Sequence, residues 1–121
     1  MDSNTMKCVY VAVHPRMENL VKVGMSSNIK ERVSVLNTSV PEDFTVVLIY
    51  ETELYDELEG LVIQTLKDEE LQEGERPTKE FFKCDVGHVK QVIDRIVEKN
   101  TGLKGAYLDD KTIQNLLRKT R

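Results

Sequence analysis

The sequence KCVYVAV at residues 7–13, taken with LVKVG at residues 20–24, decides how this chain folds. In both stretches every second residue is a valine, which is the period of a β-strand. The turn-like sequence HPRMEN at residues 14–19 separates them, so the pattern predicts an antiparallel hairpin with a six-residue loop. The five valines share one face of that hairpin, and we expect this face to lie against the core.

The opposite face of the hairpin carries Tyr10 and Lys22 beside the small residues Ala12 and Gly24. A phenol and an ammonium group would stand close together there, on a surface with room for a ligand. The alternative is a cross-strand pair that is exposed to water and has no further role. The sequence leaves both interpretations open.

Polar residues 26–28 follow the hairpin, and Asn28 with Glu31 three positions later forms a capping-box pattern. This pattern predicts a helix over residues 29–37, with Arg32 at the edge of its apolar stripe. An arginine at such an edge commonly buries its stem and keeps its head in water. Its guanidinium group is also the preferred partner of a phosphate, so a binding role is the second interpretation.

Further elements follow from apolar periodicity and capping residues. They are a buried strand over residues 44–50, a helix over 55–71, a polar loop to 79, a strand over 80–83, and a helix capped by Asp85. The order strand, strand, helix, strand, helix, strand, helix predicts an α/β fold of the α+β type, a small and mostly antiparallel sheet flanked by helices.

Residues 1–99 are expected to form this domain, and residues 100–121 an amphipathic tail that is not a separate domain. We expect Ile113, Leu116 and Leu117 to pack on the domain or on a second copy of the chain, which would make a homodimer.

The helix predicted over residues 55–71 places a carboxylate, Glu59, inside a broad apolar arc, while Glu57 falls outside it. The arc comprises Leu54, Leu58, Leu61, Val62, Ile63 and Leu66. A carboxylate on an apolar face needs a partner, because burying it unpaired is costly. The partner is either a cation such as Arg32 or Lys22, or a hard divalent ion such as Mg²⁺.

The composition excludes several classes of protein. A net charge of -4 and a pI near 5.2 argue against a broad basic surface that coats nucleic acid. The charge is uneven, however, because residues 100–121 carry five basic and two acidic side chains, a sum of +3, which leaves -7 for residues 1–99. Cys8 and Cys84 form no metal-binding or redox motif and are expected to be reduced thiols. Without an apolar run of about 20 residues or a signal pattern, we expect an intracellular protein, cytoplasmic or nuclear, with no membrane partner.

Taken together, these residues resemble the GIY-YIG nuclease superfamily. The resemblance covers roughly residues 7–97 and is strongest to the divergent branch that is common in phages, large DNA viruses and bacteria. Its motifs are Val9-Tyr10-Val11, Val21-Lys22-Val23-Gly24, the capping residues before Arg32, Leu36-Asn37-Thr38, Glu59 in a helix, and Glu80-Phe81-Phe82. In this branch lysine replaces the second tyrosine, and here Lys22 takes that position.

The resemblance implies a Mg²⁺- or Mn²⁺-dependent endonuclease acting on DNA. It assigns Tyr10 to the attacking water, Lys22 and Arg32 to the phosphate, and Glu59 to the metal ion. Three further residues are expected to contact the substrate: Gly24, Lys30 and His14. The competing hypothesis is a non-catalytic module that keeps the fold and binds nucleic acid or protein, which the charge of -7 over residues 1–99 favours.

Overall fold

The computed structural model describes residues 6–29, 31, 45–69, 71 and 81–118. The strands in this part of the chain are β1 (Cys8–His14), β2 (Met17–Ser26), β3 (Thr45–Glu51), β4 (Phe81–Lys83) and β5 (Ala106–Tyr107). The helices are α2 (Tyr55–Asp68), α3 (Val86–Lys99), α4 (Asp110–Arg118) and a single 3₁₀ turn, η1 (Thr101–Leu103). None of these helices has the length and apolar character to cross a membrane.

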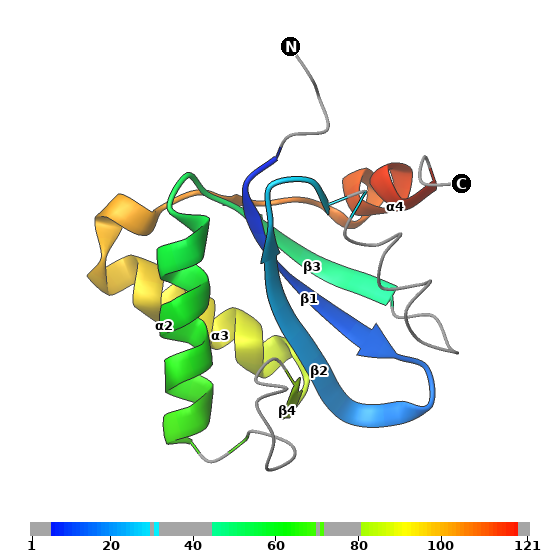
Figure 1. Cartoon of the computed structure of the whole chain (residues 1–121), viewed down its shortest axis with the longest axis horizontal. Helices are drawn as coiled ribbons and strands as arrows, with labels where there is room; N and C mark the ends of the chain where they lie inside the picture. Colours follow the sequence, from blue (N-terminus) through cyan, green and yellow to red (C-terminus); the bar gives the residue numbers. More distant parts are fainter. Residues whose placement is uncertain (1–5, 30, 32–44, 70, 72–80, 119–121) are drawn as a thin grey trace.

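The strands form one sheet in the order β4-β2-β1-β3-β5, and every pairing is antiparallel. In Figure 1, α2 and α3 lie to the left of the central strands and α4 lies to the right. The predicted α+β fold, a small antiparallel sheet flanked by helices, is therefore confirmed.

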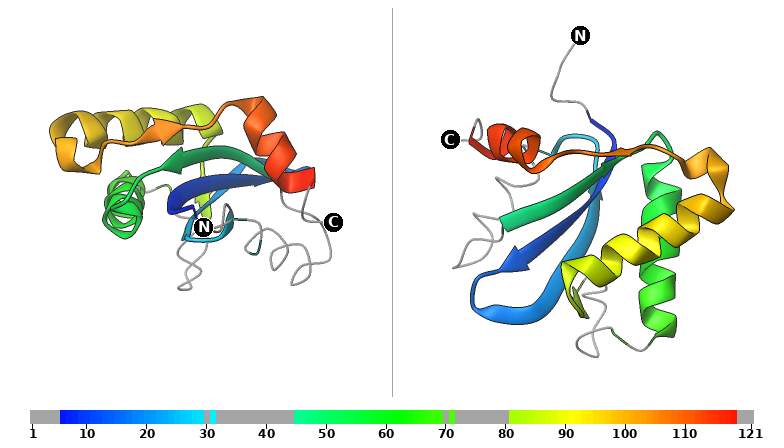
Figure 2. Two further views of the ribbon diagram at one scale, coloured as in Figure 1. Left: turned by 90° about the horizontal axis from the view of Figure 1, so that it is seen from above. Right: turned by 180° about the vertical axis from the view of Figure 1, so that it is seen from behind.

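The valine face of the hairpin is the main core, as its alternation predicts. Val9, Val11, Val21 and Val23 are at most 1% exposed and pack with buried side chains of α2 and α3. Figure 2 shows both helices on the same side of the sheet. At about 25 cal/mol per Å² of apolar surface, burial of this face is the largest stabilising contribution available to the domain.

The other face of the sheet is also covered. Tyr10 and Ala12 pack there with Val46 and Ile49 of β3, with Ile29, and with Ile113 of α4. Val46 and Ile49 reach the same face because the β1–β3 register shifts between Val11 and Ala12. Such a bulge places one extra residue in β3 and so restores the alternation on its far side.

The hairpin has longer strands and a tighter turn than the predicted six-residue loop. β1 continues through His14 and β2 begins at Met17, so residues 15–16 alone make the turn. The His14 side chain stabilises this turn, because its Nδ1 accepts the backbone N–H of Arg16 at 3.1 Å. The remaining irregularity falls at Asn19, whose φ of 56° is a conformation that asparagine tolerates.

The chain after β2 begins a helix where the capping pattern predicts one. Asn28 Oδ1 accepts the N–H of Glu31 at 3.2 Å, and the N–H of Asn28 donates to Ser26 Oγ at 2.8 Å. The rest of the helix predicted over residues 29–37, including Arg32, lies outside the described residues.

Helix α2 is shorter than the predicted 55–71 and buries a narrower stripe. It ends at Asp68, and beyond its end the Leu71 carbonyl accepts the N–H of Lys83 at 2.6 Å. Leu54 and Leu61, expected inside the buried arc, are 42% and 38% exposed. The buried positions are Leu58, Val62 and Leu66.

Helix α3 is the amphipathic helix that the sequence predicts. Its N-cap is Asp85, whose Oδ1 accepts the N–H of His88 at 2.8 Å. The His88 ring in turn meets Glu69, just beyond α2, at 2.7 Å, which joins the two helices at this end. Val89, Val92 and Ile93 form its buried stripe.

The segment after α3 belongs to the same sheet and core, with a fifth strand that the sequence pattern did not predict. Leu103 enters the main core, and β5 pairs with β3 at Tyr50 and Glu51. The predicted packing of the tail is confirmed on the domain itself for Ile113, which is 4% exposed, and for Leu116. The side chain of Leu117 lies outside the described residues.

Short-range contacts hold β5 against its neighbours. The N–H of Gly105 donates to the Tyr50 hydroxyl at 2.7 Å, and the Tyr107 hydroxyl donates to Asp94 of α3 at 2.6 Å. Burial and the hydrogen bond to the Asp94 carboxylate raise the pKa of Tyr107. Strand β5 therefore joins the end of β3 to α3.

Both cysteines are free thiols, as expected. Burial raises the pKa of Cys8 to about 12, and burial again is the main reason that the pKa of Cys84 is raised to about 11. Because the thiolate is the reactive form, neither residue is suited to nucleophilic or metal chemistry at neutral pH.

We expect Gly105→Ala to destabilise the fold by about 1–3 kcal/mol, the usual cost of forcing atoms into a packed position. A Cβ at residue 105 would overlap the Glu51 carbonyl, which is backbone and cannot rotate away. Urea unfolding followed by circular dichroism measures the effect. Gly102→Ala is the matched control, since its Cβ meets nothing within 4 Å. Equal stability of the two variants would contradict this account of β5.

Candidate functional site

The candidate site begins with the contact between Tyr10 and Gly24, which face each other across β1 and β2. Tyr10 is 1% exposed, and its ring lies where a side chain at residue 24 would have to be. A Cβ built on Gly24 would stand 2.5 Å from both Tyr10 Cζ and Tyr10 Oη. The phenol therefore crosses β2 at a position that requires glycine, because no larger residue leaves room for the ring.

Lys22 is the second polar residue on this face, and it is 6% exposed. It pairs with Ala12 of β1 on one side and with Phe81 of β4 on the other. Its Nζ lies 5.6 Å from the centroid of the Phe81 ring, within range of a cation–π interaction. Tyr10 and Lys22 are thus diagonal neighbours, as predicted, but the alternative of a water-exposed pair is wrong because both side chains are buried.

The strand pairing along the outer edge of β2 changes close to these residues. β4 pairs with β2 at residues 20–22, with Phe81 opposite Lys22. In the described part of the chain no strand follows it along residues 23–26. The hydroxyl end of Tyr10 therefore lies over the part of β2 whose outer edge has no strand partner within the described residues.

Glu59 lies in the other layer, on α2, which packs on the valine face. It is half-buried between Tyr55 and Ile63, one helical turn to either side, while Glu57 is exposed, as the arc predicted. Leu61 and Thr65 on the opposite flank of α2 face α3. Glu59 is consequently on the flank that is turned away from α3.

The remaining predicted site residues are Arg32, Lys30 and His14. Arg32 and Lys30 lie outside the described residues. His14, expected to contact the substrate, is 6% exposed, and its Nδ1 accepts the N–H of Arg16 inside the hairpin turn. It lies four residues from Tyr10 along β1, roughly 13 Å at strand spacing. The structure thus brings Tyr10, Lys22 and Gly24 together and places His14 apart from them.

Within the described residues, no three His, Cys, Asp or Glu side chains gather closely enough to hold a metal ion by themselves. Magnesium commonly takes one or two protein carboxylates and completes its shell with water and phosphate oxygens. A metal site that rests on Glu59 and a bound phosphate fits this donor chemistry.

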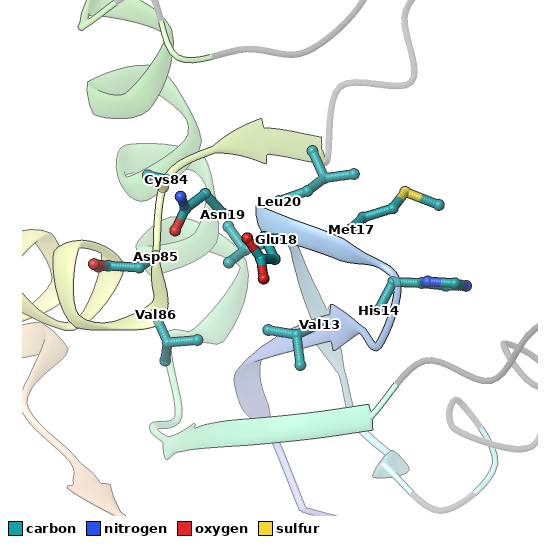
Figure 3. A pocket seen from close by; sticks show the side chains of 10 residues that line it. Val13, His14, Met17, Glu18, Asn19, Leu20, Cys84, Asp85 and Val86 are labelled. Carbon is teal, nitrogen blue, oxygen red and sulfur yellow. The ribbon is translucent and has the colours of Figure 1, made fainter.

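A cavity of about 180 Å³ lies at the turn end of the hairpin, away from Tyr10 (Figure 3). Val13, Val86, Glu18 and Asp85 are among its lining residues. Figure 3 shows His14 and Met17 projecting away from Asp85 and Val86. Two carboxylates in its wall make the cavity unsuited to a phosphate, and Asp85 is already engaged as the cap of α3.

Phe81 is a site residue to which sequence reasoning assigned no role. Its position in the sequence EFF at residues 80–82 indicated a strand, with one phenylalanine on each face. The cation–π contact with Lys22 depends on which strand β4 pairs with, and this pairing joins segments about sixty residues apart. Alternation alone could not identify that partner.

We compared this antiparallel α+β domain, with its buried tyrosine and lysine beside a glycine, with known protein families. The model of the T5orf172 domain matches residues 7–97, which is most of the chain. The chain therefore belongs to the T5orf172 domain family. At a coarse level this membership points to a nuclease-like or DNA-binding role. No curated protein and no solved structure matches the chain.

We expect Gly24→Ala to cost about 1–3 kcal/mol in the parent protein, because the new methyl group overlaps the buried Tyr10 ring. In a Tyr10→Val background the ring is gone, and the same change should be neutral or stabilising by up to about 1 kcal/mol, since glycine weakens a strand. A double-mutant cycle by urea unfolding measures this coupling. The same cost in both backgrounds would show that the ring does not fix the glycine.

Proposed function

We propose that this protein is a divalent-metal-dependent endonuclease that hydrolyses phosphodiester bonds in DNA, with a site of the GIY-YIG type. The observation that carries the proposal is the seating of Tyr10 over Gly24, beside the part of β2 that has no strand partner among the residues that the structure describes. A tyrosine held across a glycine, two residue pairs from a buried lysine, is a costly arrangement for a purely structural strand. Membership of a family with a nuclease-like or DNA-binding role supports the proposal.

In this proposal each residue has one task. Tyr10 orients the attacking water through its hydroxyl, and the packing of its ring on Gly24 fixes the direction of that hydroxyl. Lys22 and Arg32 donate hydrogen bonds to the phosphate oxygens as charge builds up in the transition state. Glu59 is the protein ligand of the divalent ion.

When bound, that ion polarises the phosphate. Glu59 lies on the flank of α2 that is turned away from α3, and α2 packs on the same hairpin whose other face holds Tyr10. The proposed meeting point of the two groups is the edge of β2 beyond Lys22, where the described residues show no further strand pairing.

A second function is favoured by one observation. Tyr10 and Lys22 are 1% and 6% exposed, so in this conformation neither can touch a DNA backbone. A domain in which both residues only stabilise the sheet would bind nucleic acid or protein without cleaving. The nuclease therefore requires that the covering on this face shift when substrate binds.

A cleavage assay separates the two functions. We expect cuts in plasmid, branched or single-stranded DNA with Mg²⁺ or Mn²⁺ and none with EDTA. Glu59→Gln and Tyr10→Phe should each reduce the rate by about 100-fold or more, the usual effect of losing one group that stabilises the transition state. Glu57→Gln, an exposed position on the same helix, is the matched control and should cut like the parent.

Circular dichroism of each variant verifies that it is folded. Absence of cleavage with every metal and substrate would reject the nuclease. Retained DNA binding in that case would support the non-catalytic module, and full activity of Glu59→Gln would reject the assigned metal ligand.

Binding to DNA should have a shallow salt dependence. Two cations, Lys22 and Arg32, with one metal ion correspond to about two or three phosphate contacts. We therefore expect the affinity for a single-stranded oligonucleotide to fall roughly 7- to 20-fold between about 50 and about 200 mM salt. Fluorescence anisotropy measures it. A loss of about 1,000-fold or more would reveal a broad basic surface instead, and no loss would reveal binding without phosphate contacts.

A further inference from the structure

A groove between α2 and α3 lies on the side of the molecule away from Glu59. It has a volume of about 270 Å³ and is lined by Leu61 and Thr65 of α2, Val92, Arg95, Ile96 and Lys99 of α3, and Asn100. None of these residues takes part in the proposed nuclease site, so a role of the groove would be separate from cleavage.

The floor of the groove is apolar. Leu61 is 38% exposed and faces Val92 and Ile96 across the helix pair. The polar side chains in the lining are satisfied internally, since the Thr65 hydroxyl donates to Leu61 O and the Asn100 amide donates to Ile96 O, each at 2.9 Å. A ligand therefore meets hydrocarbon at the centre of the groove, where exposure of Leu61 to water is unfavourable.

The rim of the groove is cationic. Arg95 and Lys99 are exposed, lie one helical turn apart, and form no ion pair or hydrogen bond with any residue that the structure describes. Lys90, one turn before Asp94 on the same helix, differs: it pairs with Asp94 and lies over the Tyr107 ring. Neither Asp94 nor Glu98 lines the groove. At roughly 100° per residue, Asp94 points to the far side of α3 and Glu98 lies on its flank, about 60° from Arg95.

The lining thus has two cations and no carboxylate, in a chain whose residues 1–99 carry a charge of -7. We propose that this groove binds an acidic, amphipathic helical segment of another protein. An apolar side chain of the partner enters between Leu61 and Ile96, and carboxylates one turn apart pair with Arg95 and Lys99. The charge complementarity is local, because the rest of the domain repels acidic partners.

DNA is a poorer occupant of this groove. A nucleic-acid backbone needs a row of cations, and it gains nothing from an apolar floor. The two cations span roughly 6 Å along α3, about the rise of one helical turn, which suits a pair of carboxylates at i and i+4 of a peptide helix.

The test is a titration of the isotope-labelled full chain followed by amide NMR. The probe is a blocked helical peptide of Ala, Glu and Leu, with two leucines at i and i+4 and a glutamate one turn to either side. The matched peptide has lysine in place of every glutamate, and a single-stranded oligonucleotide is the third probe. We expect the acidic peptide alone to shift the amides of the groove residues.

Two variants with the same change in charge sharpen the test. Arg95→Gln/Lys99→Gln should weaken binding of the acidic peptide roughly fivefold or more, in line with the loss of two exposed ion pairs. Lys104→Gln/Lys111→Gln, which removes two exposed cations outside the lining, should leave the affinity unchanged. Leu61→Ala, at an exposed position, should abolish measurable shifts without disturbing the core.

The proposal is overturned if the acidic peptide moves no groove amide, if the basic peptide moves them equally, or if the two double variants bind alike. Shifts caused by the oligonucleotide in place of the peptide would assign the groove to nucleic acid. Shifts on simple concentration of the protein would assign it to a second copy of the chain. Each outcome is independent of cleavage, because Leu61 and Glu59 lie on opposite flanks of α2.

Discussion

The burial of β1 on both of its faces is the constraint on which the rest of the structure depends. The residues from Cys8 to Ala12 are at most 1% exposed, so this strand needs a partner strand on each edge and a packed layer on each side. Val9 and Val11 obtain their layer from α2 and α3, whereas Tyr10 and Ala12 obtain theirs from Ile29, β3 and α4. The segment after α3 contributes to both layers. Leu103 and Ile113 make that contribution.

The same strand explains why the candidate site has its form. Alternation along β1 separates an entirely aliphatic face from one that holds a phenol, and pairing with β2 sets that phenol against Gly24. The tyrosine is part of the second core as well as of the proposed site, so a substitution there acts on folding and on chemistry together. Glu59, half-buried on a surface helix, is free of that conflict, which makes it the cleaner residue for separating activity from stability.

The sequence predicts a structural feature well when that feature depends on residues that are close together in the chain. The period of two in residues 7–13 and 20–24 predicted both strands and their faces, and the caps at Asn28 and Asp85 predicted helix starts, because these signals involve neighbours in the chain. The tight hairpin turn is stabilised by a contact of the His14 ring, and the Lys22–Phe81 pair depends on strand order; neither is encoded by periodicity. β5 has two residues, too few for any alternation to be visible. The exposure of Leu61 could not be predicted either. Helical spacing gives the direction in which a side chain points, but not how far the neighbouring helix covers it.

These observations change how the net charge of the chain is interpreted. A value of -4 argues against a protein that holds DNA over a wide surface, yet the proposed cleavage site needs cations at one phosphate only. The groove between α2 and α3 follows the same logic on the other flank of α2, where two cations stand over an apolar floor. An acidic surround excludes ligands that bind by charge alone and admits those that also match in shape. In such a chain the negative net charge disfavours partners that bind by charge alone. The few cations that lie beside a packed apolar surface then determine which of the other partners bind.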